Sequence, residues 1–138
     1  MTASAAVSAL PAARILIVDD EPDNRALLEI ILKWEGFTTL TADSGEEALA
    51  AAAQHDPDLM LLDLMMPGVD GYEVTARMKE NHATRSIPIV MITAMNDRVT
   101  RQRVLSAGAK DFLAKPIDRA ELCQCVRRHL RLEAARDG

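Results

Sequence analysis

The segment Ile15–Asn24 reads ILIVDDEPDN and decides the fold. Four apolar residues, of the kind that fills a buried strand, run directly into Asp19, Asp20 and Glu21, and a proline follows. Neighbouring carboxylates repel one another, and their ionised forms are difficult to hold together without a cation. The segment therefore predicts a buried strand whose carboxyl end presents acidic groups in need of a positively charged partner.

The composition is that of one ordinary globular domain. The chain has 138 residues, of which 49% are hydrophobic and 27% are charged. A formal net charge of -5, with only one Trp, one Tyr and two Phe, argues against direct binding of nucleic acid, which needs a basic face or stacking rings. No apolar run approaches the length of a membrane span, so we expect no membrane partner.

The chain is expected to divide into a flexible tail over residues 1–13, one domain over 14–133 and a short tail over 134–138. The opening MTASAAVSALPAA is rich in Ala, but it has no Lys or Arg before Arg14 and no continuous apolar core, unlike a signal peptide. Cys123 and Cys125 lie two residues apart in an expected helix, where they cannot easily bridge or share a metal. We expect free thiols, half-buried at Cys123 and more exposed at Cys125, and hence a cytoplasmic protein.

Short apolar runs alternate with longer amphipathic stretches from Arg14 onward. Strands are expected at RILIV (14–18), FTTL (37–40), DLMLLD (58–63), IPIVMI (87–92) and AKDFL (109–113). Helices are expected from Pro22 to a stop at Gly36, after the capping-box pair Ser44 and Glu47, and over about 71–80, 97–107 and 118–133. Five strand–helix repeats predict an α/β fold, a doubly wound five-stranded parallel sheet with helices on both faces.

Polar residues follow four of the five expected strands, and in a parallel sheet all of these positions lie on one rim. They are Asp19 and Asp20 after the first strand, Asp63 at the end of the third, Thr93 with Ala94 after the fourth, and Lys115 with Pro116 after the fifth. A single Asp at a strand end is usually a cap or a solvated loop residue. The whole set is harder to explain in that way.

Three carboxylates with no His or Cys nearby favour a hard cation that prefers oxygen ligands. Mg²⁺ fits best, with Mn²⁺ possible, because Mg²⁺ accepts one or two protein carboxylates and takes further oxygens from a phosphate. The ammonium of Lys115 and the hydroxyl of Thr93 suit the remaining phosphoryl oxygens. The rim is therefore predicted to hold a phosphoryl group.

The order VDDEP, LLDLMMPGVDG, ITA and KP resembles the receiver domain of bacterial two-component response regulators, over essentially all of residues 14–132. The resemblance implies a flavodoxin-like (βα)5 fold with strand order 2-1-3-4-5. It also implies a signalling phosphoacceptor rather than a conventional enzyme. Its donor would be a sensor histidine kinase or a histidine phosphotransfer protein.

The resemblance also assigns roles at the rim. Asp63 would be the phosphoacceptor and form an acyl phosphate. Asp20, Asp63 and the backbone carbonyl of Met65 would contact Mg²⁺ directly, and Asp19 mainly through water.

The remaining roles concern the phosphoryl group and the switch. Lys115 would neutralise the phosphoryl charge, and Pro116 would follow a cis bond that aims this lysine. Thr93 would donate its hydroxyl, and Phe112 matches the aromatic switch position. Ala94 would keep access for the phosphodonor. Met65 and Met95 would flank the approach of the hydrolytic water and slow dephosphorylation, because neither can orient a water.

The resemblance implies that a downstream effector or a second copy docks on the face made by the regions 97–107, 109–113 and 118–133. We expect Val99, Val104 and Phe112, with the arginines Arg98, Arg101 and Arg103, to be offered there. The three histidines, His55, His82 and His129, match no ligand pattern and are expected at the surface.

The sequence fits two other site types poorly and leaves two alternatives open. A phosphatase of the haloacid-dehalogenase type would need a second Asp two residues after Asp63, where Met65 stands. A P-loop or dinucleotide-binding protein would need a glycine-rich first loop, and DDEPDN has no glycine. A receiver-like module that binds partners without phosphorylation stays open, as does an N-terminal receiver fragment of a longer multidomain regulator.

Overall fold

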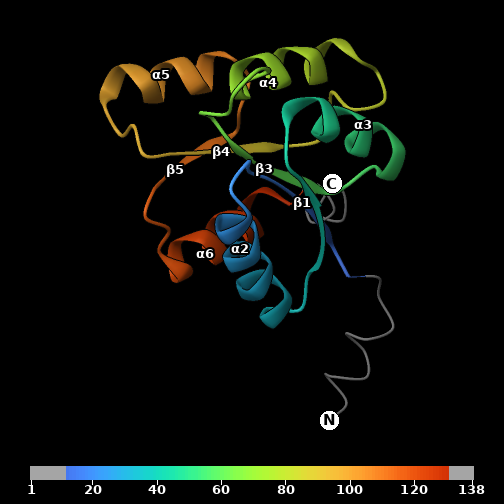
Figure 1. Cartoon of the computed structure of the whole chain (residues 1–138), viewed down its shortest axis with the longest axis vertical. Helices are drawn as coiled ribbons and strands as arrows, with labels where there is room; N and C mark the ends of the chain where they lie inside the picture. Colours follow the sequence, from blue (N-terminus) through green and yellow to red (C-terminus); the bar gives the residue numbers. More distant parts are fainter. Residues whose placement is uncertain (1–11, 131–138) are drawn as a thin grey trace.

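Strands and helices alternate along the part of the chain that the computed structural model describes, residues 12–130 (Figure 1). The strands are β1 (Arg14–Val18), β2 (Thr38–Ala42), β3 (Leu59–Asp63), β4 (Ile89–Thr93) and β5 (Asp111–Ala114). The helices are α2 (Pro22–Trp34), α3 (Gly45–His55), α4 (Gly71–Glu80), α5 (Arg98–Ser106) and α6 (Arg119–His129). Most of the first expected tail and all of the second lie outside the described residues.

The strands form one parallel sheet in the order β2-β1-β3-β4-β5, which confirms the predicted fold class and strand order. Figure 1 shows α2 and α6 on one face of the sheet and α3, α4 and α5 on the other. The carboxyl ends of β1 and β3 lie side by side, with Val18 paired to Leu62. The acidic residues that follow these two strands are thereby brought to one place.

Two hydrophobic cores fill the space between the sheet and its two helical layers. In β1, Leu16 and Val18 face the core under α3, α4 and α5, whereas Ile15 and Ile17 face the core under α2 and α6. All residues of β3 and β4 are buried. This burial on both faces explains why the central strands are continuous apolar runs instead of alternating ones.

The helix starts follow the signals in the sequence. Ser44 accepts a hydrogen bond from the Glu47 backbone N–H, as the capping box predicts. Asp70, Asp97 and Asp118 cap α4, α5 and α6 in the same way. Strand β4 begins at Ile89, two residues later than predicted, because Pro88 has no N–H to donate. Helix α6 ends at His129, earlier than predicted, where Leu130 turns to an extended backbone.

Two predictions about side-chain exposure are wrong. Cys125 is not the more exposed cysteine, because it packs into the core between α6 and the sheet, and Cys123 is buried as well. Val104 and Phe112 are buried in the other core, so the face made by α5, β5 and α6 offers Val99 but not these two side chains. Helices α6 and α5 turn Cys125 and Val104 toward the sheet, and β5 turns Phe112 into the core, which a linear pattern did not resolve.

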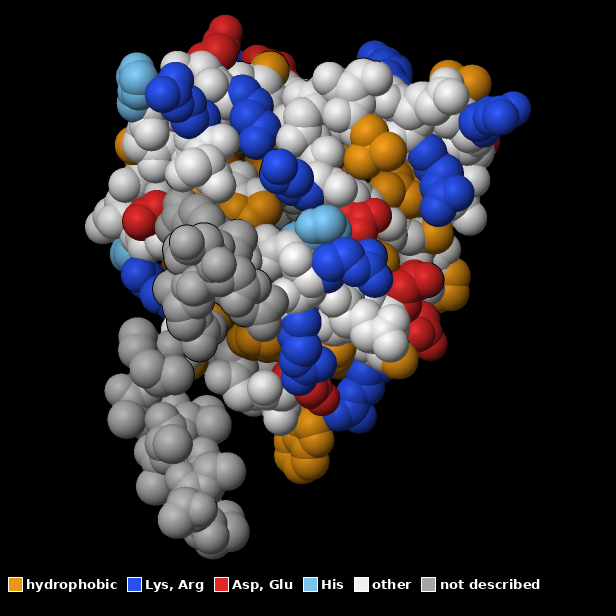
Figure 2. All heavy atoms as spheres, turned by 180° about the vertical axis from the view of Figure 1, so that it is seen from behind, with side chains coloured by type: hydrophobic (Ala, Val, Ile, Leu, Met, Phe, Trp, Pro, Cys, Tyr) orange, Lys and Arg blue, Asp and Glu red, His pale blue; other side chains and the backbone are white. Residues whose placement is uncertain are grey.

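The described surface is mixed in charge. Figure 2 shows Lys and Arg side chains spread over the rear face with acidic groups among them, while hydrophobic side chains form small separate groups. Within residues 12–130, every helix is too short or too polar to cross a membrane.

Gly71 is the first residue of α4 and sets how closely this helix approaches the end of β3. A Cβ at this position would lie 2.8 Å from Leu64 Cα, 2.9 Å from Met91 Sδ and 3.2 Å from the Asp63 carbonyl oxygen. Replacing Gly by Ala in a helix ordinarily stabilises a protein by about 0.4–1 kcal/mol. Here the added methyl group must displace backbone atoms beside Asp63.

We therefore expect Gly71→Ala to lower the free energy of unfolding by about 1–3 kcal/mol, as overpacking does. Urea denaturation measures this change. The control is Glu80→Ala at the exposed end of α4, which should change stability by less than about 0.5 kcal/mol. A neutral or stabilising Gly71→Ala would show that the approach of α4 to β3 is loose.

Candidate functional site

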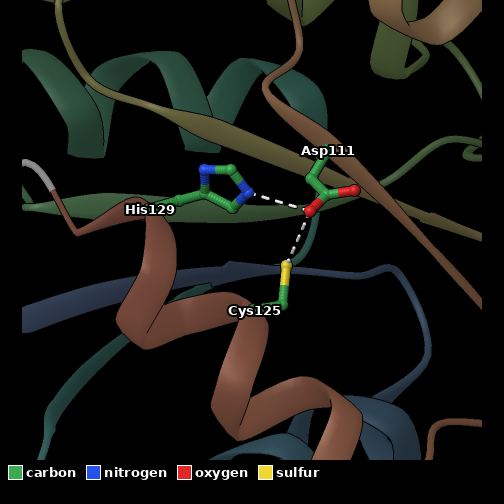
Figure 3. Close-up of side chains that lie close together, drawn as sticks. All are labelled: Asp111, Cys125 and His129. Carbon is green, nitrogen blue, oxygen red and sulfur yellow. Dashed lines mark hydrogen bonds and ion pairs between the residues drawn. The ribbon is translucent and has the colours of Figure 1, made fainter.

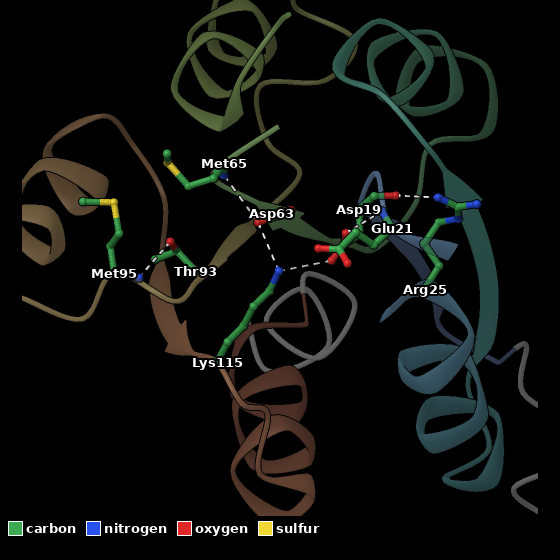
Figure 4. Close-up of polar contacts among 8 residues, drawn as sticks. All are labelled: Asp19, Glu21, Arg25, Asp63, Met65, Thr93, Met95 and Lys115. Carbon is green, nitrogen blue, oxygen red and sulfur yellow. Dashed lines mark hydrogen bonds and ion pairs between the residues drawn. The ribbon is translucent and has the colours of Figure 1, made fainter. Parts of the chain in front are cut away.

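The three predicted carboxylates meet at the carboxyl ends of β1 and β3. Figure 4 shows two of them, Asp19 and Asp63. One carboxylate oxygen from each of Asp19, Asp20 and Asp63 can be chosen such that all three lie within 4.8 Å of one another. Asp19 and Asp63 are only 2% and 4% exposed. The rim of the sheet therefore holds a compact, largely buried acidic cluster, as the sequence predicted.

Backbone and side-chain donors fix the loop that carries Asp19. The Glu21 N–H donates to Asp19 Oδ1 at 2.9 Å, and the Arg25 guanidinium donates to the Asp19 carbonyl oxygen at 2.7 Å. Pro22 starts α2 directly after this turn. Sequence reasoning missed Arg25. Its signal was a basic residue in the first turn of the helix that follows the acidic loop.

Asp63 is held by the loop between β3 and α4. The Met65 N–H donates to Asp63 Oδ1 at 3.3 Å (Figure 4). Leu64, which follows Asp63 in the chain, donates its N–H to the Ile92 carbonyl at 2.9 Å. The Leu64 carbonyl accepts a hydrogen bond from the Gly71 N–H at 3.0 Å. These bonds on both sides of Leu64 anchor the loop to β4 and α4, so the Asp63 carboxylate has a defined position.

Lys115 bridges the two buried carboxylates. Its Nζ lies 3.5 Å from Asp19 Oδ2 and 3.5 Å from Asp63 Oδ1. The Lys115 N–H donates to the Thr93 carbonyl at 2.9 Å, and the bond from Lys115 to Pro116 is cis, as predicted. Lys115 follows β5, and its side chain extends past the end of β4 to the carboxylates that follow β1 and end β3.

The acidic cluster holds more negative charge than Lys115 neutralises. Burial, and then the neighbouring charge of Asp19, raise the pKa of Asp63 to about 6, although Lys115 and the Met65 N–H oppose this. A carboxylate with a raised pKa is one whose ionised form is under-stabilised. An all-oxygen donor set of this kind, with unsatisfied negative charge, fits a hard divalent cation.

Thr93 and Ala94 lie at the end of β4 on the other side of Asp63. Thr93 is buried, and its Oγ1 accepts a hydrogen bond from the Met95 N–H at 3.1 Å. Met65 and Met95 are 60% and 46% exposed. That they flank the path of the hydrolytic water stays a prediction.

A cavity of about 390 Å³ opens beside the acidic cluster. It extends from Asp19, Ala94 and Lys115 to an apolar wall, which consists of Leu27, Leu28, Ile92, Pro116 and Ile117, with Asn24 at its edge. Sequence reasoning did not identify this wall, because it joins α2 to the segment after β5, far apart in the chain. The site therefore has an open side large enough to admit a reactant.

Phe112 lies in β5, and its ring points into the core. The Arg101 guanidinium of α5 lies 5.5 Å from the centre of the ring. The aromatic residue is therefore inward in this structure, with a cation at the face of its ring.

Comparison with known proteins agrees with this geometry. The model of the response regulator receiver domain family matches residues 15–127. The chain belongs to the response regulator receiver domain family. The match covers most of the described residues and every site residue named above.

Two relatives show how the chain compares with whole regulators. Response regulator PleD of Caulobacter vibrioides is 50% identical over 115 residues, which are 83% of this chain and 25% of PleD. The DNA-binding response regulator MtrA of Mycolicibacterium smegmatis is 43% identical over 118 residues, 86% of this chain and 50% of MtrA. The chain thus spans a quarter to a half of these relatives.

Two solved structures share the fold. Chemotaxis protein CheY4 of Vibrio cholerae superposes with a TM-score of 0.82 at 29% identity, over 87% of this chain and all of CheY4. The receiver domain of a sensor histidine kinase from Pseudomonas aeruginosa gives a TM-score of 0.80 at 33% identity, over 86% and 98% of the two chains. That structure has a magnesium ion coordinated in its active-site cleft.

Proposed function

We propose that this receiver domain accepts a phosphoryl group on Asp63 with the help of Mg²⁺. The observation that carries the proposal is the buried Asp63 carboxylate, 3.5 Å from the Lys115 ammonium and grouped with Asp19 and Asp20 at the strand ends. The sensor-kinase receiver with its bound magnesium supports the choice of ion. The function is that of a signalling phosphoacceptor and not of a conventional enzyme.

Asp20, Asp63 and the Met65 carbonyl would hold the ion, with Asp19 acting mainly through water. Mg²⁺, or Mn²⁺ in its place, would supply charge neutralisation between the carboxylates and the phosphoryl oxygens. This role agrees with the raised pKa of Asp63, because a divalent cation favours the ionised carboxylate that must act as nucleophile.

In the transfer step an Asp63 carboxylate oxygen attacks the phosphorus and forms a new P–O bond. The P–N bond to the donor histidine breaks at the same time, and its electron pair stays on the imidazole, which takes up a proton. Lys115 remains beside Asp63 and pairs with a phosphoryl oxygen, while Thr93 donates its hydroxyl. The donor is a sensor histidine kinase or a histidine phosphotransfer protein.

Two further statements about the whole protein belong to the same proposal. MtrA is a DNA-binding regulator, but the chain spans only half of it, and we propose that residues 14–133 themselves contact no nucleic acid and no membrane. A cytoplasmic location is proposed because the donor kinases of such domains transfer phosphate there. A receiver that binds partners without phosphorylation is the second candidate, and the next experiment distinguishes it.

We expect a small phosphodonor such as acetyl phosphate, with Mg²⁺, to add one phosphate per chain, and Asp63→Asn to abolish the addition. Intact-mass spectrometry measures the change. The control is Asp43→Asn, because Asp43 is an exposed carboxylate in the loop after β2 and should not alter uptake. Uptake that survives Asp63→Asn, or no uptake by the wild type in Mg²⁺, would contradict the proposal.

Phosphorylation should change the face made by α5, β5 and α6, where a downstream effector or a second copy would bind. The phosphoryl group is expected to accept a hydrogen bond from the Thr93 hydroxyl. This bond should shift the equilibrium between two positions of the Phe112 side chain. Backbone NMR shifts on adding beryllofluoride, which mimics the phosphoryl group, should therefore extend from Thr93 to Arg101 and Phe112. Shifts confined to the loops around Asp63 would contradict this coupling.

Met65 and Met95 are expected to lengthen the life of the acyl phosphate, because neither side chain can orient the attacking water. Introducing polar groups with Met65→Asn and Met95→Glu should speed loss of the phosphate by a factor of roughly ten to a thousand. The half-life of radiolabelled protein measures the rate. The matched control, Met65→Leu with Met95→Leu, should decay no faster than the wild type. Equal rates for the polar and apolar pairs would show that the methionines only fill space.

A further inference from the structure

A second group of side chains of the types that bind metals lies at the opposite end of the sheet from Asp63. Asp111 is the first residue of β5, and Cys125 and His129 lie in α6 (Figure 3). His129 Nε2 is 2.8 Å and Cys125 Sγ is 3.5 Å from the same oxygen, Asp111 Oδ2. The three potential ligand atoms lie within 4.8 Å of one another. Three different ligand types thus converge on one point.

The spacing within α6 places two of these ligands on one helical face. Cys125 and His129 are four residues apart, and side chains at this separation are neighbours on a helix. Asp111 comes from a different element and faces them from the sheet. His129 was predicted at the surface, and its side chain is 20% exposed and hydrogen-bonded to Asp111 Oδ2. The sequence pattern did not indicate this contact, because Asp111 comes from β5.

The cluster is sheltered but not sealed. Cys125 is buried, whereas the side chains of His129 and Asp111 are 20% and 31% exposed. Solvent therefore reaches the cluster at His129 and Asp111, so a bound metal ion could keep a water molecule in its coordination sphere.

We propose that Asp111, Cys125 and His129 bind a zinc-type transition-metal ion through one carboxylate oxygen, one thiolate sulfur and one imidazole nitrogen. Three protein ligands of this mixed kind, with a fourth position for water, are typical of open zinc sites. Thiolate and imidazole favour Zn²⁺ or a similar ion over Mg²⁺, which distinguishes this site chemically from the all-oxygen cluster at Asp63.

The charges of the ligands balance those of the ion. The Asp111 carboxylate and a Cys125 thiolate together offset a divalent cation, and His129 binds as the neutral ring. Burial and the nearby Asp111 charge raise the pKa of the Cys125 thiol to about 12. Metal binding must therefore release the thiol proton to solvent as the S–metal bond forms.

Arg128 is the group that competes with the ion. Its Nη1 lies 3.4 Å from Asp111 Oδ2, but its side chain is 62% exposed. An exposed ion pair of this kind contributes little stability, so the guanidinium can move into solvent when a metal occupies the carboxylate. Without metal, Cys125, His129 and Arg128 are hydrogen-bonded to Asp111 Oδ2. A bound ion would replace these hydrogen bonds with metal–ligand bonds.

Co²⁺ is the probe for this site, because a thiolate bound to Co²⁺ gives a charge-transfer absorption band that oxygen ligands do not. The full chain, kept reduced with a phosphine and free of affinity tags, should develop this band with one equivalent of Co²⁺ and lose it when Zn²⁺ is added. Asp63→Asn should keep the band. The measurement is thus independent of the proposed phosphorylation.

Cys125→Ser should abolish the band, whereas Cys123→Ser, two residues away on the same helix, should keep it. His129→Gln, at a partly exposed position, should weaken Co²⁺ binding at least about tenfold, since even outer-shell changes cost about 10–100-fold. His55→Gln is the matched control with unchanged affinity. A wild type without the band, a band that survives Cys125→Ser, or an unchanged Co²⁺ affinity in His129→Gln would overturn the proposal.

Discussion

The structure depends on the electrostatic conflict between two buried carboxylates. Asp19 and Asp63 follow adjacent parallel strands, and a single ammonium, that of Lys115, lies 3.5 Å from both. Burial and mutual repulsion leave Asp63 with a pKa of about 6. Such a site costs stability in the folded protein, and the conflict is relieved when cations are added. The cluster therefore favours a divalent ion, and we propose that a phosphoryl group on Asp63 shares this ion.

The rest of the fold serves to hold these charges in place. The strand order puts β1 and β3 side by side at the centre of the sheet, where both faces are covered. Arg25 and the Glu21 N–H fix the Asp19 loop, and the close approach of Gly71 fixes the loop after Asp63. Lys115 and Thr93 are joined through a backbone hydrogen bond between β5 and β4. The proposed coupling between a phosphoryl group on Asp63 and the strand that carries Phe112 would run through this bond.

Much of this could be predicted from the sequence, because strand ends in a parallel sheet share one rim. The positions of Asp19, Asp63, Thr93 and Lys115 followed from that rule together with the family resemblance. Side-chain orientation did not follow: the inward turn of Cys125 and Val104 depends on how α6 and α5 rotate against the sheet. Contacts between distant segments were also missed, as with Asp111 and His129, which lie 18 residues apart. The periodicity of apolar residues predicts each helix or strand separately. It does not predict which residues of two different elements contact each other.

The most direct test of the central claim is the titration of the Asp63 side-chain carboxyl by ¹³C NMR, with and without Mg²⁺. Without divalent ions the midpoint should lie at about 6, because burial and Asp19 disfavour the charged form. Saturating Mg²⁺ should move the midpoint well below this value, since the ion binds only the ionised carboxylate. The displacement should shrink in Asp20→Asn, which removes a ligand. A midpoint near the ordinary 3.8 in metal-free buffer, or one that Mg²⁺ leaves unchanged, would contradict the account.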